Sequence, residues 1–284
     1  MRETDTRTLS KHETATPRND ARGPHDPDLA LRNRTLARTA VSEAQGILTQ
    51  RYRLPSQETA FELLRLASQR HNIKLHTLAD AVTRVPGPDH DAALWFPGRA
   101  RTSAPPLTRI LPSDQRSSSA TQGQVLSATL KRVLEITETG MGNVQLAERG
   151  LLRLEKHTGL NRRFTDFFTF VDHSSTACAQ AAENREQVTV HDVATAPVFD
   201  AESRHVILQA DSRACHSIPL VGHRGALLGV ISSHHRHPLS GFTRAQLNSL
   251  QSTATDAGHW LSWHRRTIVL DALEHLHTAA RQMT

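Results

Sequence analysis

Basic side chains are the residues of this sequence whose type and distribution point most directly to a chemistry. Residues 29–84 contain nine Arg or Lys and four Asp or Glu, a net charge of +5, out of +6 for the whole chain of 284 residues. Residues 122–265 contain fourteen basic and thirteen acidic residues, a net charge of +1. A basic face attracts phosphates and makes binding dependent on salt, although a solvated helix face carries the same charges. The distribution therefore favours a nucleic acid as the partner of the first segment.

The other reactive side chains form no pattern that predicts catalysis. The sequence has no phosphate-binding glycine loop, dinucleotide fingerprint or nucleophile elbow. The densest histidine cluster, at 234–237, has no partner at zinc-finger spacing, and Cys178 and Cys215 stand 37 residues apart. As small, apolar residues, such cysteines are more typical of core packing than of redox sensing. We therefore expect no enzyme, no metal and no cofactor, apart from an unknown small-molecule ligand considered below.

Three helical patterns with short breaks must position the basic residues of 32–84. Their apolar residues recur at three- and four-residue spacing, which predicts helices with one buried face. Ser56 is placed to cap the second helix, and Pro86-Gly87-Pro88 ends the third. The predicted buried positions are Leu36, Ala40, Ala44, Ile47 and Leu48 in the first helix, Ala60, Phe61, Leu64 and Ala67 in the second, and Leu75, Leu78, Ala79 and Val82 in the third.

This stretch resembles the ANTAR domain over about 50 residues. The family is a three-helix RNA-binding module of bacterial transcription antiterminators, so the resemblance implies an RNA hairpin as partner. Two positions depart from the family pattern: Gln45 replaces a basic residue, and Thr49 replaces a common Met. The matching positions are Val41, Ala44, Gly46, Ile47, Leu48, Ala60, Phe61, Leu64, Arg65, Ser68, Asn72, Lys74, Leu75 and Ala79.

A small helical module suits the unstacked bases of a hairpin loop better than an A-form duplex. DNA is not the expected partner, because the pattern of a helix-turn-helix recognition helix is missing. Gly46 has no side chain and Ala44 a small one, which lets RNA approach the first helix, or lets helices pack closely. We expect Arg65 to contact a base and Lys74 to contact a phosphate. The predicted RNA-binding residues are Ala44, Gln45, Gly46, Arg51, Arg53, Arg65, Asn72 and Lys74.

The second half of the chain alternates short strand patterns with helices and predicts an α+β fold with an antiparallel sheet. A tight turn at 222–225 joins two of the strands. This half resembles the GAF domain over about 140 residues, a family of sensory and dimerising modules. The segments that carry the resemblance are 142–146, 167–168, 177–178, 190–195, 217–220 and 228–232.

The GAF resemblance implies a pocket over the sheet that a small molecule fills or that is closed by packing. The residues predicted to line it are Phe168, Phe170, His173, Cys178 and Ser217. Apolar stripes on the helices at 125–139 and from Thr243, continued through Ile268, Leu270, Leu273 and Leu276, predict a homodimer.

The sequence thus predicts a disordered tail (1–28), an all-α three-helix ANTAR-like domain (29–85), a Pro/Ser-rich linker (86–121) and a GAF-like domain (122–284). Trp95-Phe96 is expected to dock on one of the domains. No segment is apolar enough to span a membrane and the first residues lack a signal peptide, so we expect a cytoplasmic protein. The favoured function is an RNA-binding transcription antitermination regulator under the control of a sensor domain. The alternatives are a ligand sensor whose helices contact another protein, and a DNA-binding regulator.

Overall fold

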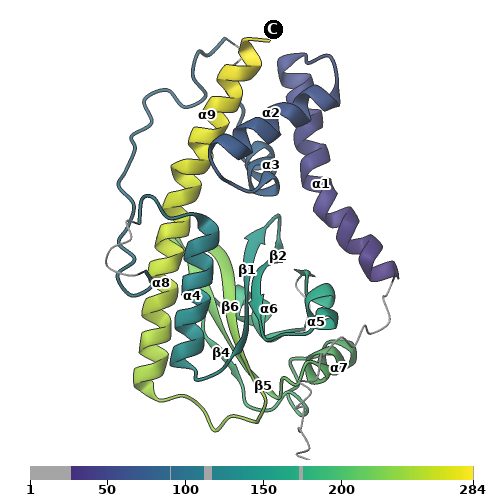
Figure 1. Ribbon diagram of the computed structural model, residues 1–284, viewed down its shortest axis with the longest axis vertical. Coiled ribbons are helices and arrows are strands. Elements are labelled where there is room, and N and C mark those ends of the chain that lie inside the picture. Colours follow the sequence, from purple (N-terminus) through teal and green to yellow (C-terminus); the bar gives the residue numbers. More distant parts are fainter. Residues whose placement is uncertain (1–26, 90, 112–116, 173–174, 284) are drawn as a thin grey trace, which may run out of the picture.

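The structure is a computed structural model that describes residues 27–89, 91–111, 117–172 and 175–283. A helical module and an α+β domain lie at opposite ends of the molecule (Figure 1). The helices are α1 (Pro27–Tyr52), α2 (Gln57–Arg70), α3 (Leu75–Arg84), α4 (Gln122–Ile136), α5 (Arg162–Phe167), α6 (Ala177–Asn184), α7 (Ala201–Gln209), α8 (Arg244–Arg266) and α9 (Ile268–Arg281). The strands are β1 (Met141–Glu148), β2 (Leu151–Thr158), β3 (Phe170–Val171), β4 (Val188–Val190), β5 (Ala214–Val221) and β6 (Leu227–His235).

The predicted fold class, an all-α module followed by an α+β domain, is confirmed. The six strands form one antiparallel sheet in the order β3-β2-β1-β6-β5-β4. Side chains of α4 and α8 share a core with one face of this sheet, and side chains of α5, α6 and α7 share a core with the other face. The predicted turn at 222–225 joins β5 to β6 and includes a short 3-10 helix, His223–Gly225. Of the predicted disordered tail, residues 1–26 lie outside the described residues, whereas Pro27 and Asp28 already belong to α1.

Local chemistry explains where the helices of the first module begin. The hydroxyl of Ser56 accepts a hydrogen bond from the amide of Thr59 at 3.3 Å, which caps α2 as predicted. Arg53 adopts a left-handed conformation (φ 49°) that turns the chain between α1 and α2. Most predicted apolar positions are buried, including Ala44, Leu64 and Leu78, each at 0% exposure.

The helical module contains a fourth helix that the sequence analysis assigned to the other domain. α9 packs on α2 and α3, and its apolar face lies in the same core as theirs. The packing therefore groups residues 268–281 with the N-terminal helices and not with the GAF-like segment 122–284. The α9 residues buried in this core are Val269, Ala272, Leu273, Leu276 and Ala280.

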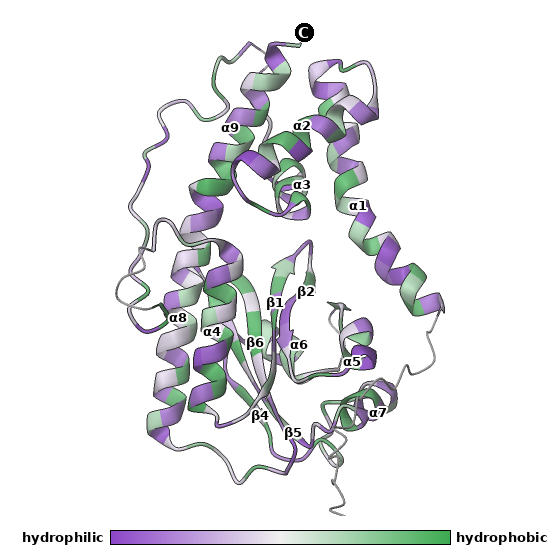
Figure 2. Cartoon of the chain, in the orientation of Figure 1, coloured by the Kyte–Doolittle hydropathy of each residue, from purple (hydrophilic) through white to green (hydrophobic). Residues whose placement is uncertain are grey.

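α8 and α9 form an almost continuous rod that belongs to both halves of the molecule (Figure 1). Only Thr267 separates them, at φ −117° and ψ −71°. α8 fits closely against the sheet at Gly258, where a Cβ atom would overlap the backbone of Val221. Along both helices hydrophobic and hydrophilic residues alternate in bands, as expected for helices with one buried face (Figure 2).

The apolar stripes that led to the homodimer prediction are buried by contacts within a single chain. Leu126, Leu130 and Val133 of α4 are buried against α8 and the sheet. Leu273 and Leu276 are buried in the helical module, as described above. The argument for a dimer through unpartnered apolar faces is therefore wrong in its premise.

The segment 86–121 contains no helix or strand among its described residues, and its docking is confirmed at Trp95. The Trp95 side chain is buried, and its indole N–H donates to the carbonyl of Pro86 at 2.8 Å. The backbone amides of Trp95 and Phe96 donate to the two carboxylate oxygens of Glu274 on α9. The segment thus fastens α9 to the end of α3.

Candidate nucleic-acid interface

The two small residues of the predicted RNA surface on α1, Ala44 and Gly46, face in different directions. Ala44 is fully buried, so its small side chain serves the packing of α1 against the other helices. Gly46 faces outwards, because a Cβ atom placed there would have no neighbour within 4 Å. Gln45 lies beside it and donates from its amide to the carbonyl of Gln57 at 3.0 Å. The expectation of open backbone is therefore wrong for Ala44 and stands for Gly46.

The two arginines at the end of α1 have different surroundings. The Arg51 guanidinium lies over the Trp95 ring, 5.0 Å from its centroid, a cation–π contact with the docked segment. A Cβ atom on Gly87 would come within 2.8 Å of this guanidinium, so a larger residue there would require the Arg51 side chain to shift. Arg53 is exposed. Arg53 is therefore accessible to a phosphate, whereas Arg51 helps to hold the docked segment.

Arg65 and Asn72 also lie on the surface of the module. The Arg65 guanidinium donates to Glu62 at 2.7 and 2.9 Å and to Gln69 at 2.9 Å. Exposed ion pairs of this kind are weak, so an RNA phosphate or base can replace Glu62 at little cost. Asn72 is exposed in a left-handed conformation (φ 49°) at the end of α2. Whether these residues bind RNA stays a prediction.

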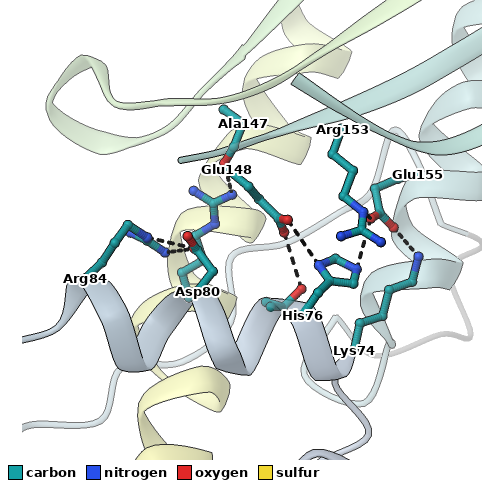
Figure 3. Close-up of polar contacts among 10 residues, drawn as sticks. Lys74, His76, Asp80, Arg84, Ala147, Glu148, Arg153 and Glu155 are labelled. Carbon is teal, nitrogen blue, oxygen red and sulfur yellow. Dashed lines mark hydrogen bonds and ion pairs between the residues drawn. The ribbon is translucent and has the colours of Figure 1, made fainter. Parts of the chain in front are cut away.

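Lys74, the expected phosphate contact, is bound to a carboxylate of the other domain. Its ammonium pairs with Glu155 on β2, whose side chain is 1% exposed, while the Lys74 side chain stays 48% exposed. Two residues further on, His76 lies between two carboxylates. Its Nδ1 is 3.0 Å from Glu148 Oε2, and its Nε2 is 3.3 Å from Glu155 Oε1 (Figure 3).

The charged groups at this contact between α3 and the GAF domain shift one another's pKa values. Burial on its own would lower the pKa of His76, but Glu148 and Glu155 outweigh it and the pKa is raised. Burial on its own would raise the pKa of Glu155, but His76 and Lys74 outweigh it and the pKa is lowered. Both partners are thereby stabilised in their charged forms.

Further polar contacts surround this pair of carboxylates. Arg149, in the β1–β2 turn, forms a two-point ion pair with Glu43 of α1 at 2.7 and 2.8 Å. Arg265, at the end of α8, donates to the carbonyl of Ala147 at 2.8 Å, and burial lowers its pKa. We name this set of residues the junction: Glu43, Lys74, His76, Thr77, Glu148, Arg149, Arg153, Glu155 and Arg265. The sequence analysis missed all of it except Lys74, because no local pattern links α3 to the β1–β2 turn.

The predicted pocket residues do not form one group. Phe168 and Cys178 lie in the core between the sheet and helices α5 to α7, and Ser217 bonds Ser232 on the same face at 2.9 Å. Phe170 is not part of that core and instead contacts the Arg153 guanidinium, 5.4 Å from its ring centroid. His173 lies outside the described residues.

A row of buried polar side chains lines the same sheet face as Phe168 and Ser217. His234 bonds Asn143 at 3.1 Å and Ser212 at 2.9 Å, and burial lowers its pKa to about 3. Gln145 donates to the carbonyl of Phe168, and its Oε1 has no hydrogen-bond partner among the described residues. The signal for this row was present in β1, where Asn143 and Gln145 alternate with apolar residues. A small-molecule ligand at this face stays a prediction.

The histidine side chains at the end of β6 do not form one cluster. His234 packs on Phe164 and His235 on Phe242, which lie on opposite sides of the sheet. Within the described ranges, no three His, Cys, Asp or Glu residues are arranged to hold a metal ion. No helix of those ranges is long and apolar enough to cross a bilayer.

A six-stranded antiparallel sheet with helices on both faces, joined to a small basic helical module, defines a two-domain protein with an all-α and an α+β part. The chain contains an ANTAR domain, because residues 29–82 match that family model, and a GAF domain, because residues 123–259 match that one. No curated protein matches the sequence.

Solved structures resemble part of the chain at low identity. The GAF domain of an Acinetobacter phosphoenolpyruvate-protein phosphotransferase is 15% identical over 52% of this chain and 86% of its own, with a TM-score of 0.43. A GAF domain/HD domain protein from Geobacter sulfurreducens is 14% identical over 52% and 95%, with a TM-score of 0.44. Free methionine-R-sulfoxide reductase from Neisseria meningitidis is 18% identical over 59% and 85%, with a TM-score of 0.39.

Proposed function

We propose that this protein is a non-enzymatic regulator of transcription antitermination that binds hairpin RNA through its ANTAR domain. The observation that carries the proposal is the charge of that domain, because the +5 of residues 29–84 accounts for most of the net +6. Bound hairpin RNA would be stabilised and would exclude a terminator hairpin from the transcript. The GAF domain would set how readily the RNA surface is reached.

Gly46→Leu is expected to reduce hairpin binding at least tenfold while the module stays folded. The new side chain enters open space, so it causes no internal clash, and leucine favours a helix over glycine by roughly 1 kcal/mol. Any loss of binding would then come from blocked approach to the α1 backbone. The measurement is a titration of the full chain with hairpins selected from a pool of randomised loops.

Thr35→Leu is the matched control, since Thr35 is an exposed residue of α1 three turns away from Gly46. It should leave the affinity unchanged. Equal affinities of the wild type and Gly46→Leu would place the RNA surface elsewhere. Tighter binding to duplex DNA of the same sequence would favour the DNA-binding alternative.

A homodimer stays part of the proposal, although its expected apolar faces are buried in the chain. We expect light scattering at micromolar concentration to give about twice the monomer mass of 31.5 kDa. The GAF family includes dimerising modules, and the solvent side of α4 carries Lys131 and Glu135, an ion pair at 3.9 Å. A mass equal to that of the monomer would contradict this part of the proposal.

A further inference from the structure

The β1–β2 hairpin of the GAF domain covers the start of α3 with two carboxylates. Glu148 and Glu155 have side chains that are 9% and 1% exposed, and both point toward the first turn of α3 (Figure 3). Burying carboxylates is costly unless charged partners compensate for the lost water. The partners are Lys74 and His76, two residues of the ANTAR domain itself.

The chemistry of this contact resembles that of a phosphate on a basic protein surface. A carboxylate and a phosphate both present anionic oxygens that accept charge-assisted hydrogen bonds from an ammonium group. Burial opposes the ionisation of Glu155, but His76 and Lys74 outweigh burial and lower its pKa, so Glu155 is an anion at neutral pH. While Glu155 holds Lys74, the ammonium has fewer N–H groups left for RNA.

The contact is also of a kind that can open. It consists of ion pairs and hydrogen bonds, such as Arg149 with Glu43 and Thr77 with Glu148, which water and salt can replace. The Lys74 side chain is 48% exposed, so an incoming phosphate can reach it before the contact breaks. The turn that carries Arg149 and Gly150 adopts left-handed conformations and projects from the sheet.

We propose that the β1–β2 hairpin is an internal competitor of RNA: Glu148 and Glu155 occupy Lys74 and His76 in place of RNA phosphates. The inference rests on the proposed RNA-binding function and adds the contact through which the GAF domain restrains it. RNA binding then requires the junction to open at α3. A change in the GAF sheet that moves β1 or β2 then alters RNA affinity by opening or closing this contact.

The test is the affinity of the full chain for the same selected hairpin RNAs. Glu148→Gln/Glu155→Gln is expected to raise the affinity about tenfold, the gain of one charged contact. The matched control is Glu183→Gln/Glu186→Gln, which removes two exposed carboxylates of the GAF domain and changes the net charge equally. Equal gains in the two double variants would overturn the proposal, because the effect would then be net charge alone.

Two further variants separate the proposed competition from the effect of net charge. Arg149→Ala removes a cation, which on charge alone lowers RNA affinity, but it also breaks the pair with Glu43 and is expected to raise affinity two- to threefold. Lys74→Ala is expected to remove the gain of Glu148→Gln/Glu155→Gln, as a coupled pair requires. A fall in RNA affinity for Arg149→Ala would contradict the proposed competition. So would a gain in affinity from Glu148→Gln/Glu155→Gln that persists when Lys74 is replaced by Ala.

The outcomes also separate this inference from the proposed function. If the wild type and all variants fail to bind the hairpin pool, the RNA-binding function is wrong and the competitor falls with it. If all of them bind with one affinity, the function stands and only the competitor is wrong. Amide hydrogen exchange across residues 74–84 should be faster in Glu148→Gln/Glu155→Gln while the protection of β5 and β6 is kept.

Discussion

Leu276→Ala is expected to lower the stability of the helical module by about 2–5 kcal/mol, the usual cost of truncating a large buried side chain. Leu276 lies on α9, is 0% exposed and shares its core with α1, α2 and α3. The effect should be large because α9 fills one side of a small module that has little other apolar area to bury. Truncation after Thr267 should therefore unfold α1 to α3 and abolish RNA binding.

Amide hydrogen exchange of α2 measures this effect, since a denaturation curve of a two-domain chain does not assign stability to one domain. Leu66→Ala is the matched control, because Leu66 lies on α2 but is 52% exposed. It should change stability by no more than about 0.5 kcal/mol. Unchanged α2 protection in Leu276→Ala would mean that the three N-terminal helices fold without α9.

Lowering the pH from 7 to 5 is expected to cost the GAF domain roughly 2 kcal/mol for each of three buried histidines. Burial lowers the pKa of His216 and His264 to about 4 and that of His234 to about 3. An exposed histidine in the unfolded chain has a pKa of about 6.5. These groups therefore stabilise the fold above about pH 6.5, and the contribution is lost as the pH falls toward the lower folded values.

His264→Phe isolates one of these contributions. His264 is 3% exposed and stacks on Trp260 with ring centroids 5.0 Å apart, and its Nδ1 bonds nothing among the described residues. Phenylalanine can keep the stacking without titrating. Relative to the wild type, the variant should therefore gain roughly 2 kcal/mol more stability at pH 5 than at pH 7.5.

Urea unfolding at the two pH values, monitored by exchange in the sheet, gives this difference. His237→Phe is the control, since His237 is exposed just after the end of β6. This variant should leave the pH dependence of the stability unchanged. A gain for His264→Phe that is equal at both pH values would show that His264 titrates in the folded protein as it does in the unfolded chain.

The sequence by itself determined the elements and the class of each half. Helical spacing and the Ser56 cap predicted α1 to α3, and the turn at 222–225 predicted the β5–β6 hairpin, because these signals act between residues close in the chain. The strand patterns likewise predicted an antiparallel sheet. The two families could be recognised for the same reason, since each domain match depends on short-range spacing within one segment.

Only the tertiary structure decided what the predicted faces pack against. The stripe through Leu273 and Leu276 requires burial, but its periodicity is the same whether the partner is a second copy, the sheet or α2. Ala44 and Gly46 are both small, yet one is in the core and the other faces outwards. The sequence pattern could not distinguish these two cases.

The junction shows the same limit for charges. Lys74 looked available to RNA because its neighbours in sequence leave it on a polar face, and its partner Glu155 is 81 residues away. Which carboxylate meets it depends on how the β1–β2 hairpin packs against the start of α3, a long-range arrangement that no local spacing encodes. Coulomb energy depends on distance in space and on burial, so ion pairs between domains become visible only once the chain is folded.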